Sequence, residues 1–96
     1  MKKNVNDPSV RRFFEGLLTL ESVEECYAFF DDICTRNEIL SIAQRFQVGE
    51  MLLDKNTYQT ISKTTGASTT TISRVNRLLG DDQEGIEMVH DRLRGK

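Results

Sequence analysis

An all-α fold of about six helices, including a helix-turn-helix, is predicted for this chain of 96 residues. Apolar side chains recur at spacings of three and four residues, no alternating β-branched run occurs, and capping motifs precede several apolar stretches. Hydrophobic residues make up 38% of the chain and charged residues 29%, which is an ordinary balance for a folded protein. We therefore expect one domain spanning residues 1–96.

Two helices are expected between residues 8 and 34. Asp7 and Pro8 suit the N-cap and the first position of a helix, because an N–H at that position would lack a partner within the helix. Ser22 and Glu25 have the spacing of a capping box, which starts the second helix. Both helices carry apolar stripes, although so short a chain can cover little apolar surface by itself. Dimerisation through residues 8–34 would bury these stripes.

The rest of the chain is expected to begin and end with one helix each. Thr35 and Glu38 form a second pair at capping-box spacing, which starts a long central helix over residues 35–54. The last helix is expected over residues 82–94, where apolar side chains recur at helical spacing.

Between these helices, residues 57–79 have the pattern of a helix-turn-helix. Thr57 caps a short helix that ends at Thr65, Gly66 opens the turn, and a second helix covers residues 69–79. The side chains expected to pack the two helices together and to anchor the second one are Ile61, Ser62, Ala67, Ile72, Val75, Leu78 and Leu79.

The net charge of −2 hides a basic segment. Residues 35–79 contain six basic and three acidic side chains, and residues 55–80 contain no acid at all. Acids elsewhere in the chain are screened beyond a Debye length of about 10 Å. An acidic protein can therefore still present a basic face to an anionic polymer.

The second helix of the motif is unusual for a helix that only packs, because it begins with several poor helix formers, Ser and Thr. Short hydroxyl side chains suit contacts with phosphates and base edges, and Arg74 and Arg77 share a helix face. The alternative is an exposed polar helix that binds nothing. The candidate DNA-contacting residues are Gln59, Ser62, Lys63, Ser68, Thr69, Thr70, Thr71, Ser73, Arg74 and Arg77.

Four segments of this region resemble the Trp repressor family, specifically its branch of small Trp-repressor-like proteins: residues 35–38, 43–46, 49–53 and 66–74. The resemblance implies an intertwined all-helical homodimer whose second motif helix enters the major groove of a palindromic operator in double-stranded DNA. The expected function is thus that of a DNA-binding transcriptional repressor. The alternative is a helix-turn-helix used for protein contact.

The same resemblance points to an effector pocket. Thr35, Arg45 and Arg74 match family positions that surround bound tryptophan. Val75 and Leu78 stand where the family has a glycine and a serine, and added volume in a tight pocket is costly. L-Tryptophan is therefore not expected as a corepressor, while another anionic effector remains open.

Other chemistry is not expected. Cys26 and Cys34 on one helix would lie about 12 Å apart, too far for a disulfide, and we expect both to be buried thiols. The one histidine, His90, sits among acidic neighbours and is expected at the surface. No catalytic or metal-binding motif occurs, so the chain is not expected to be an enzyme. No apolar run could span a membrane, the start lacks a secretory apolar region, and a cytoplasmic location is expected.

Overall fold

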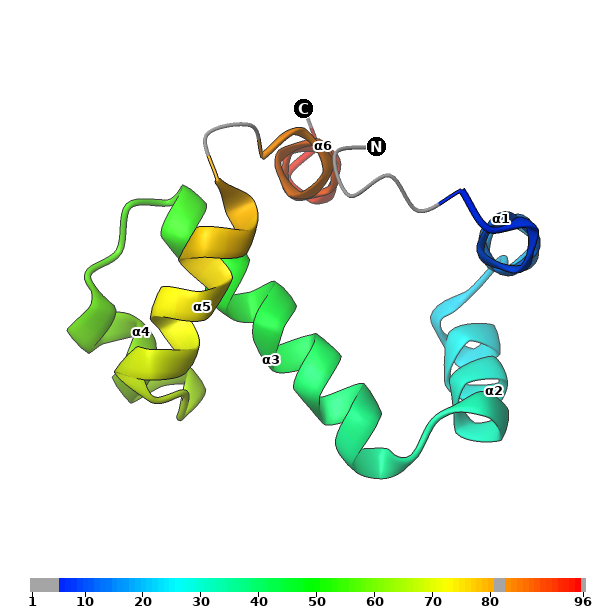
Figure 1. Cartoon of the computed structure of the whole chain (residues 1–96), viewed down its shortest axis with the longest axis horizontal. Coiled ribbons are helices and arrows are strands. Elements are labelled where there is room, and N and C mark those ends of the chain that lie inside the picture. The colour runs from blue at the N-terminus through cyan, green and yellow to red at the C-terminus, as the bar shows by residue number, and fades with distance from the viewer. Residues whose placement is uncertain (1–5, 81–82, 96) are drawn as a thin grey trace. The chain divides into compact units, whose positions relative to one another are not determined.

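The structure, a computed structural model, describes residues 6–80 and 83–95 (Figure 1). Over these residues it contains six helices and no strand, which confirms the predicted all-α class. The chain divides into two compact units, residues 1–35 and residues 36–96. Each unit is described by itself below.

The first unit contains α1 (Pro8–Leu17) and α2 (Val23–Ile33), and both begin where the sequence predicted. The Asp7 carboxylate accepts a hydrogen bond from the Ser9 N–H at 2.8 Å. The Ser22 hydroxyl accepts one from the Glu25 N–H at 3.1 Å. The returning bond of the capping box differs from expectation, because the Glu25 carboxylate accepts from the N–H of Glu21 at 2.8 Å. These caps satisfy N–H groups that have no partner within the helix.

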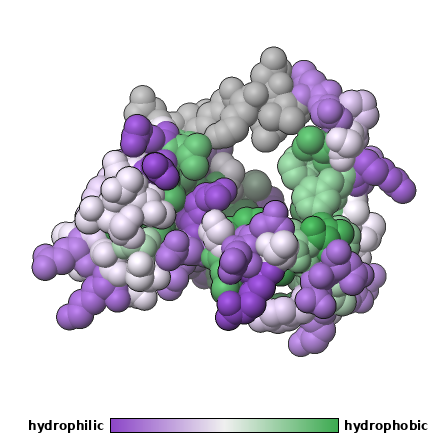
Figure 2. Space-filling model, turned by 60° about the horizontal axis from the view of Figure 1, so that its bottom comes forward, coloured by the Kyte–Doolittle hydropathy of each residue, from purple (hydrophilic) through white to green (hydrophobic). Residues whose placement is uncertain are grey.

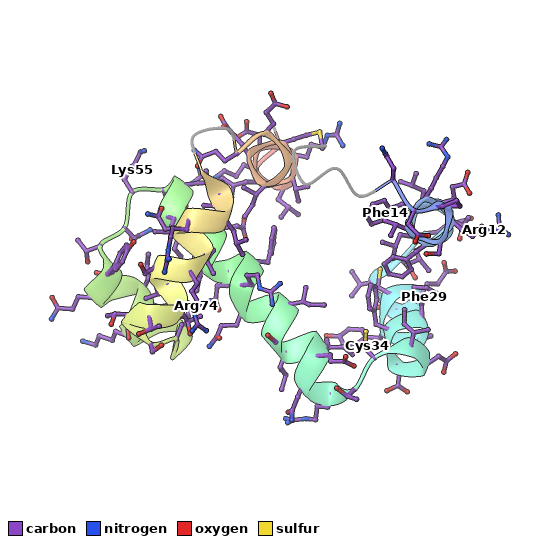
Figure 3. The ribbon with its side chains drawn as sticks, in the orientation of Figure 1. Arg12, Phe14, Phe29, Cys34, Lys55 and Arg74 are labelled. Carbon is purple, nitrogen blue, oxygen red and sulfur yellow. The ribbon has the colours of Figure 1, made fainter. Side chains whose placement is uncertain are left out.

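An aromatic cluster joins α1 to α2 within this unit. The Phe13 ring lies 6.0 Å from those of Phe14 and Phe29 and 6.5 Å from that of Phe30, measured between centroids. Figure 3 labels Phe14 and Phe29, whose helices face each other through this cluster. The cluster is too small to cover the stripes, because no residue of α1 or α2 is buried. Apolar side chains over these helices form green surface in Figure 2.

The two cysteines differ in exposure. Neither forms a disulfide, as predicted, but Cys26 is exposed and only Cys34 is partly buried. The expectation that both thiols are buried was wrong for Cys26. The sequence shows only that Cys26 lies on the apolar stripe of its helix, whereas burial of that stripe needs a surface that this unit does not supply.

The second unit is built around α3 (Arg36–Leu53). Three helices pack on it: α4 (Tyr58–Thr65), α5 (Thr69–Leu79) and α6 (Glu84–Leu93). In Figure 1, α4 and α5 lie side by side at the C-terminal part of α3. The buried apolar core consists of Val48, Ile61, Ala67, Ile72 and Val75. It draws on α3 and on both helices of the predicted helix-turn-helix, so the motif folds as part of this unit.

The chain leaves α3 through a left-handed residue. Lys55 has φ of 65°, and its N–H donates to the Leu52 carbonyl at 3.0 Å while the Asn56 N–H donates to the Met51 carbonyl at 3.1 Å. This pair of bonds is a Schellman cap, which usually has glycine at the left-handed position. A lysine there costs about 1 kcal/mol or more relative to glycine.

The last helix, α6, begins at Glu84 rather than at residue 82. Residue 82, at which the helix was predicted to begin, lies outside the described residues. Gln83 precedes the helix without a capping hydrogen bond from its side chain. The helix approaches α3 closely at Gly49, because a Cβ atom built there would overlap Cδ1 of Ile86.

The surface position predicted for His90 was wrong. The residue is only 7% exposed and lies between a carboxylate of α3 and one directly after that helix. Its Nδ1 is 2.6 Å from Oε2 of Glu50, and its Nε2 is 3.0 Å from Oδ1 of Asp54. Arg94 reaches the same Asp54 oxygen at 3.2 Å. The acidic residues next to His90 in sequence suggested a surface position. Its actual hydrogen-bond partners precede it in the chain by 40 and 36 residues, so local sequence could not identify them.

Candidate nucleic-acid interface

The turn between α4 and α5 is closed by side chains as well as by glycine. Gly66 ends α4 with φ of 76°, a left-handed conformation that disfavours any side chain. The Ser62 hydroxyl donates to the Ala67 carbonyl at 2.7 Å, and the Thr65 hydroxyl donates to the Ile61 carbonyl at 2.8 Å. The Ala67 N–H in turn donates to the Thr65 hydroxyl at 3.1 Å. These bonds fix the angle at which α5 leaves the turn.

Apolar packing holds α5 against α4 and α3. Ile61 and Ile72 are fully buried, and Ala67 and Val75 are 3% and 5% exposed. These four residues occupy the inward positions that the sequence predicted. Leu78 does not, because it is 47% exposed, so its predicted role as an anchor was wrong. It lies on the same side of α5 as Arg74, one turn earlier, and faces outward with it.

The first turn of α5 presents hydroxyl groups to solvent. Ser68 is the N-cap, and its hydroxyl accepts from the Thr71 N–H at 3.1 Å. Thr69 and Thr70 are exposed, whereas Thr71 and Ser73 are partly buried. The pale surface over α4 and α5 in Figure 2 reflects these hydroxyl-bearing side chains. The two partly buried residues face different neighbours, because Ser73 lines a hollow with Tyr58 of α4 and Thr71 lines one with Arg45 of α3.

The outward face carries positive charge that no acid neutralises. Arg74 and Arg77 are both exposed, line one shallow hollow together with Leu78, and so share a face as predicted. On α4, Gln59 and Lys63 are exposed and one turn apart. Among the residues that the structure describes, Lys63, Arg74 and Arg77 form no ion pair. Their charges are therefore available to an anion from outside.

The candidate contact Ser62 is placed differently from the others. It is partly buried, and its hydroxyl proton is used by the Ala67 carbonyl inside the turn. Its hydroxyl oxygen can still accept a hydrogen bond, but phosphates offer only acceptors. Ser62 consequently serves the shape of the motif, as its predicted packing role requires.

One residue at this surface was missed by the sequence reasoning. Tyr58, the first residue of α4, lines a hollow together with Thr69, Thr70, Ser73 and Arg77 of α5. Its phenol adds a hydrogen-bond donor and an aromatic face to that surface. An aromatic residue directly after the Thr57 cap, within an otherwise polar helix start, was the available signal. The tertiary packing of α4 against α5 was needed to interpret it.

The candidate effector residues come together only in part. Arg45 of α3 and Arg74 of α5 line one hollow, whose other residues are Ser41, Gln44, Thr71, Val75 and Leu78. Both residues that were expected to fill the pocket, Val75 and Leu78, therefore border the two arginines. Thr35 belongs to the other unit, and the hollow is lined by residues of the 36–96 unit alone.

The described residues also bear on metal binding and membrane insertion. In residues 6–80 and 83–95, no group of three or more His, Cys, Asp or Glu side chains could hold a metal ion. No helix in the described part of the chain is long and apolar enough to cross a membrane.

These features define a class: an all-helical protein with a helix-turn-helix whose second helix is exposed, basic and rich in hydroxyl groups. The sequence profile of the Trp repressor protein family matches residues 8–94. A relative, the uncharacterized protein YerC of Bacillus subtilis, is 52% identical over 83 residues, which cover 86% of this chain and 80% of YerC.

Two crystal structures are similar throughout. A TrpR-like protein from Eubacterium eligens has a TM-score of 0.87 and 46% identity, covering 95% of this chain and 94% of its own. A putative Trp repressor from Staphylococcus aureus has a TM-score of 0.88 and 46% identity, covering 96% and 92%. The chain belongs to the Trp repressor family, whose helix-turn-helix proteins are DNA-binding regulators rather than enzymes.

Proposed function

We propose that this protein is a transcriptional repressor that binds a palindromic operator in double-stranded DNA as a homodimer. The observation that carries the proposal is the outward face of α5, where Arg74 and Arg77 lie beside exposed threonines and form no ion pair with any acid that the structure describes. Phosphate contacts need such free cations, and base edges need short polar side chains close to the backbone. For this function the protein must share a compartment with the DNA, so the proposed location is the cytoplasm.

The DNA contacts divide by role. Lys63 and Gln59 of α4 and the hydroxyl of Thr69 lie on the motif's surface and contact phosphates, which sets the register of the motif on the duplex. The Ser68 hydroxyl donates to the Thr71 hydroxyl and so serves the cap of α5 instead. Arg74, Thr70, Thr71, Ser73 and Arg77 lie along α5, the helix that enters the major groove, and the arginines can meet guanine edges there.

Selection from a pool of random duplexes tests operator binding. We expect enrichment of a two-fold symmetric site with half-sites about 34 Å apart, because two recognition helices of one dimer read successive turns of one DNA face. Replacing both arginines with alanine should weaken binding and flatten the dependence of log affinity on log salt by roughly two. Arg92→Ala, an exposed arginine of α6, is the matched control. Unchanged affinity and slope in the double variant would contradict the assigned face.

The dimer is proposed from the apolar surface of the first unit. Leu18 and Tyr27 are 85% and 74% exposed, and Val23 and Ile33 are at least half exposed. Side chains of this kind in contiguous patches mark an interface between chains. Sedimentation at micromolar concentration should give a dimer, and Leu18→Glu should shift it towards monomer while Gln47→Glu does not. A wild-type species of 11.0 kDa would contradict the dimer.

The protein is proposed to bind its operator without tryptophan. Val75 and Leu78 border the hollow between Arg45 and Arg74 and leave it without the small residues that the family pocket has. Titration calorimetry with L-tryptophan should give no heat of binding. Dependence of operator binding on a pool of other amino acids would instead assign an effector to that hollow.

A second candidate is a helix-turn-helix that contacts protein. The partly apolar hollow at Arg74, Arg77 and Leu78 favours it, because an exposed leucine suits protein better than phosphate. It predicts no enriched duplex even at low salt. Repression itself is tested with a reporter downstream of the selected operator, whose expression should rise when the gene for this protein is removed.

A further inference from the structure

His90 has an environment that only its charged form satisfies. Each ring nitrogen faces a carboxylate oxygen: Nδ1 lies 2.6 Å from Glu50, and Nε2 lies 3.0 Å from Asp54. Carboxylates are acceptors, so both nitrogens must donate, and only the imidazolium has two N–H groups. The ring is 7% exposed, so water cannot replace either partner without moving α6. Hydrogen bonds to charged groups of this kind are stronger than neutral ones.

This arrangement links the last helix to the end of the central helix. Glu50 lies on α3 and Asp54, one turn later, directly follows the last residue of that helix, and His90 brings α6 to both of them. Arg94, just beyond α6, adds an ion pair to Asp54 at 3.2 Å. We name His90, Glu50, Asp54 and Arg94 the α3–α6 clamp.

Next to the clamp, α3 also contacts α5. Gly49 directly precedes Glu50 on α3, and a Cβ atom built on Gly49 would overlap Ile86 of α6 and come within 4.0 Å of Val75 of α5. Val75 is buried, and the residue before it, Arg74, lies on the outward face of α5. Displacement of α6 would take Ile86 away from Gly49, the residue of α3 beside which Val75, 5% exposed, also packs. Gly49 is therefore the point through which docking of α6 can act on α5.

We propose that His90 is a positioning residue: as an imidazolium it fastens α6 to α3, braces α5 through Gly49, and so makes DNA affinity fall as pH rises. The DNA part of this inference rests on the proposed function. The bracing of α5 does not, because it concerns the folded chain alone.

The sign of the pH dependence follows from the groups around the ring. Hydrogen bonds from His90 to Glu50, and then to Asp54, raise the pKa of the imidazole, while burial and Arg94 act in the opposite direction. A raised pKa in the folded state means that the clamp contributes fully below the unfolded value of about 6.5 and is lost as pH rises through the folded value. The pH dependence therefore begins near pH 6.5 and ends above the raised pKa of the folded state.

The first test is a proton NMR titration of the full-length protein. Because the chain contains one histidine, its ring signal needs no assignment by mutation. The midpoint should lie above the ordinary value and should fall towards it in Asp54→Asn. Glu87→Gln, an exposed acid of α6, should leave the midpoint unchanged and serves as the control. A wild-type midpoint at or below about 6.5 overturns the clamp.

The second test compares the wild type with His90→Gln, which keeps a side-chain donor but has no charge. At pH 6.5, amide hydrogen exchange in α5 should be faster in the variant, whether or not the protein binds DNA. Operator affinity of the wild type should drop about fivefold between pH 6.5 and pH 9, at the lower end of known couplings between sites, and the variant should show a flat profile.

Three results are decisive. Equal α5 exchange in the wild type and His90→Gln overturns the bracing of α5. If the NMR midpoint of wild-type His90 is raised but the operator affinity of the wild type does not change with pH, the link to DNA is overturned. Absence of DNA binding at every pH refutes the proposed function, while the titration and the exchange comparison still decide the clamp and the bracing.

Discussion

Helix α6 approaches α3 closely at Gly49, where a Cβ atom would overlap Cδ1 of Ile86. Gly49→Ala adds that atom to a buried position of α3. Two opposing effects set the result. Alanine is better than glycine inside a helix by about 1 kcal/mol, whereas overpacking a core costs about 1–3 kcal/mol. We expect a net destabilisation of about 1 kcal/mol.

A second substitution isolates the cause. Ile86→Val removes the very methyl group that a Cβ at residue 49 would meet, and alone it should cost about 0.5–1.5 kcal/mol. In the double variant the alanine Cβ no longer overlaps a methyl group of residue 86, so the better helix propensity of alanine at position 49 remains as a gain. The double variant should therefore be more stable than the sum of the two single changes predicts, by about 1–2 kcal/mol, which is within the range for residues in contact.

Urea unfolding at one fixed protein concentration measures all four proteins, because a dimer's stability depends on concentration. A difference from additivity below about 0.5 kcal/mol would refute the reasoning, since independent sites add to within that margin. It would mean that α6 shifts to make room for the alanine and that Gly49 is not a fixed contact between the helices.

Three further changes test other parts of the structure. Lys55→Gly should raise the melting temperature, because it relieves a left-handed lysine by about 1 kcal/mol, and a lower melting temperature would contradict the cap described at the end of α3. Ser68→Ala should cost about 1 kcal/mol by removing the N-cap of α5, whereas the exposed Ser41→Ala should cost less than half as much, as thermal unfolding can show. Tyr58→Phe should weaken operator binding by about 1 kcal/mol without a change in stability, and equal affinity in a binding titration would remove Tyr58 from the interface.

The starts of α1, α2, α4 and α5 and the turn at Gly66 were determined by local sequence. Asp7, Ser22, Thr57 and Ser68 each cap a helix, and Gly66 forms the left-handed turn. These features depend on hydrogen bonds and backbone conformations that span only a few residues, so local sequence is sufficient to specify them. The inward positions of the helix-turn-helix were also predictable, because helical periodicity fixes which side chains share a face.

The recognition surface was predicted in composition and only partly in arrangement. The acid-free stretch identified Lys63, Arg74 and Arg77, which all prove exposed. Periodicity did not show that Tyr58 borders the hydroxyls of α5, because that contact depends on the angle between two helices. It also placed Leu78 in the core, although the side chain lies on the arginine face.

Only the tertiary structure decided the environment of His90. Its partners lie at the end of α3 and directly after it, far away in sequence, and the acids next to His90 on α6 gave the opposite expectation. A titratable group takes its charge state from whatever surrounds it in space, and no local pattern carries that information. The same holds for Gly49, whose lack of a side chain has a purpose only once Ile86 of α6 lies against it. The sequence determined the elements and the basic face, and the packing of α6 on α3 determined what the buried polar groups can do.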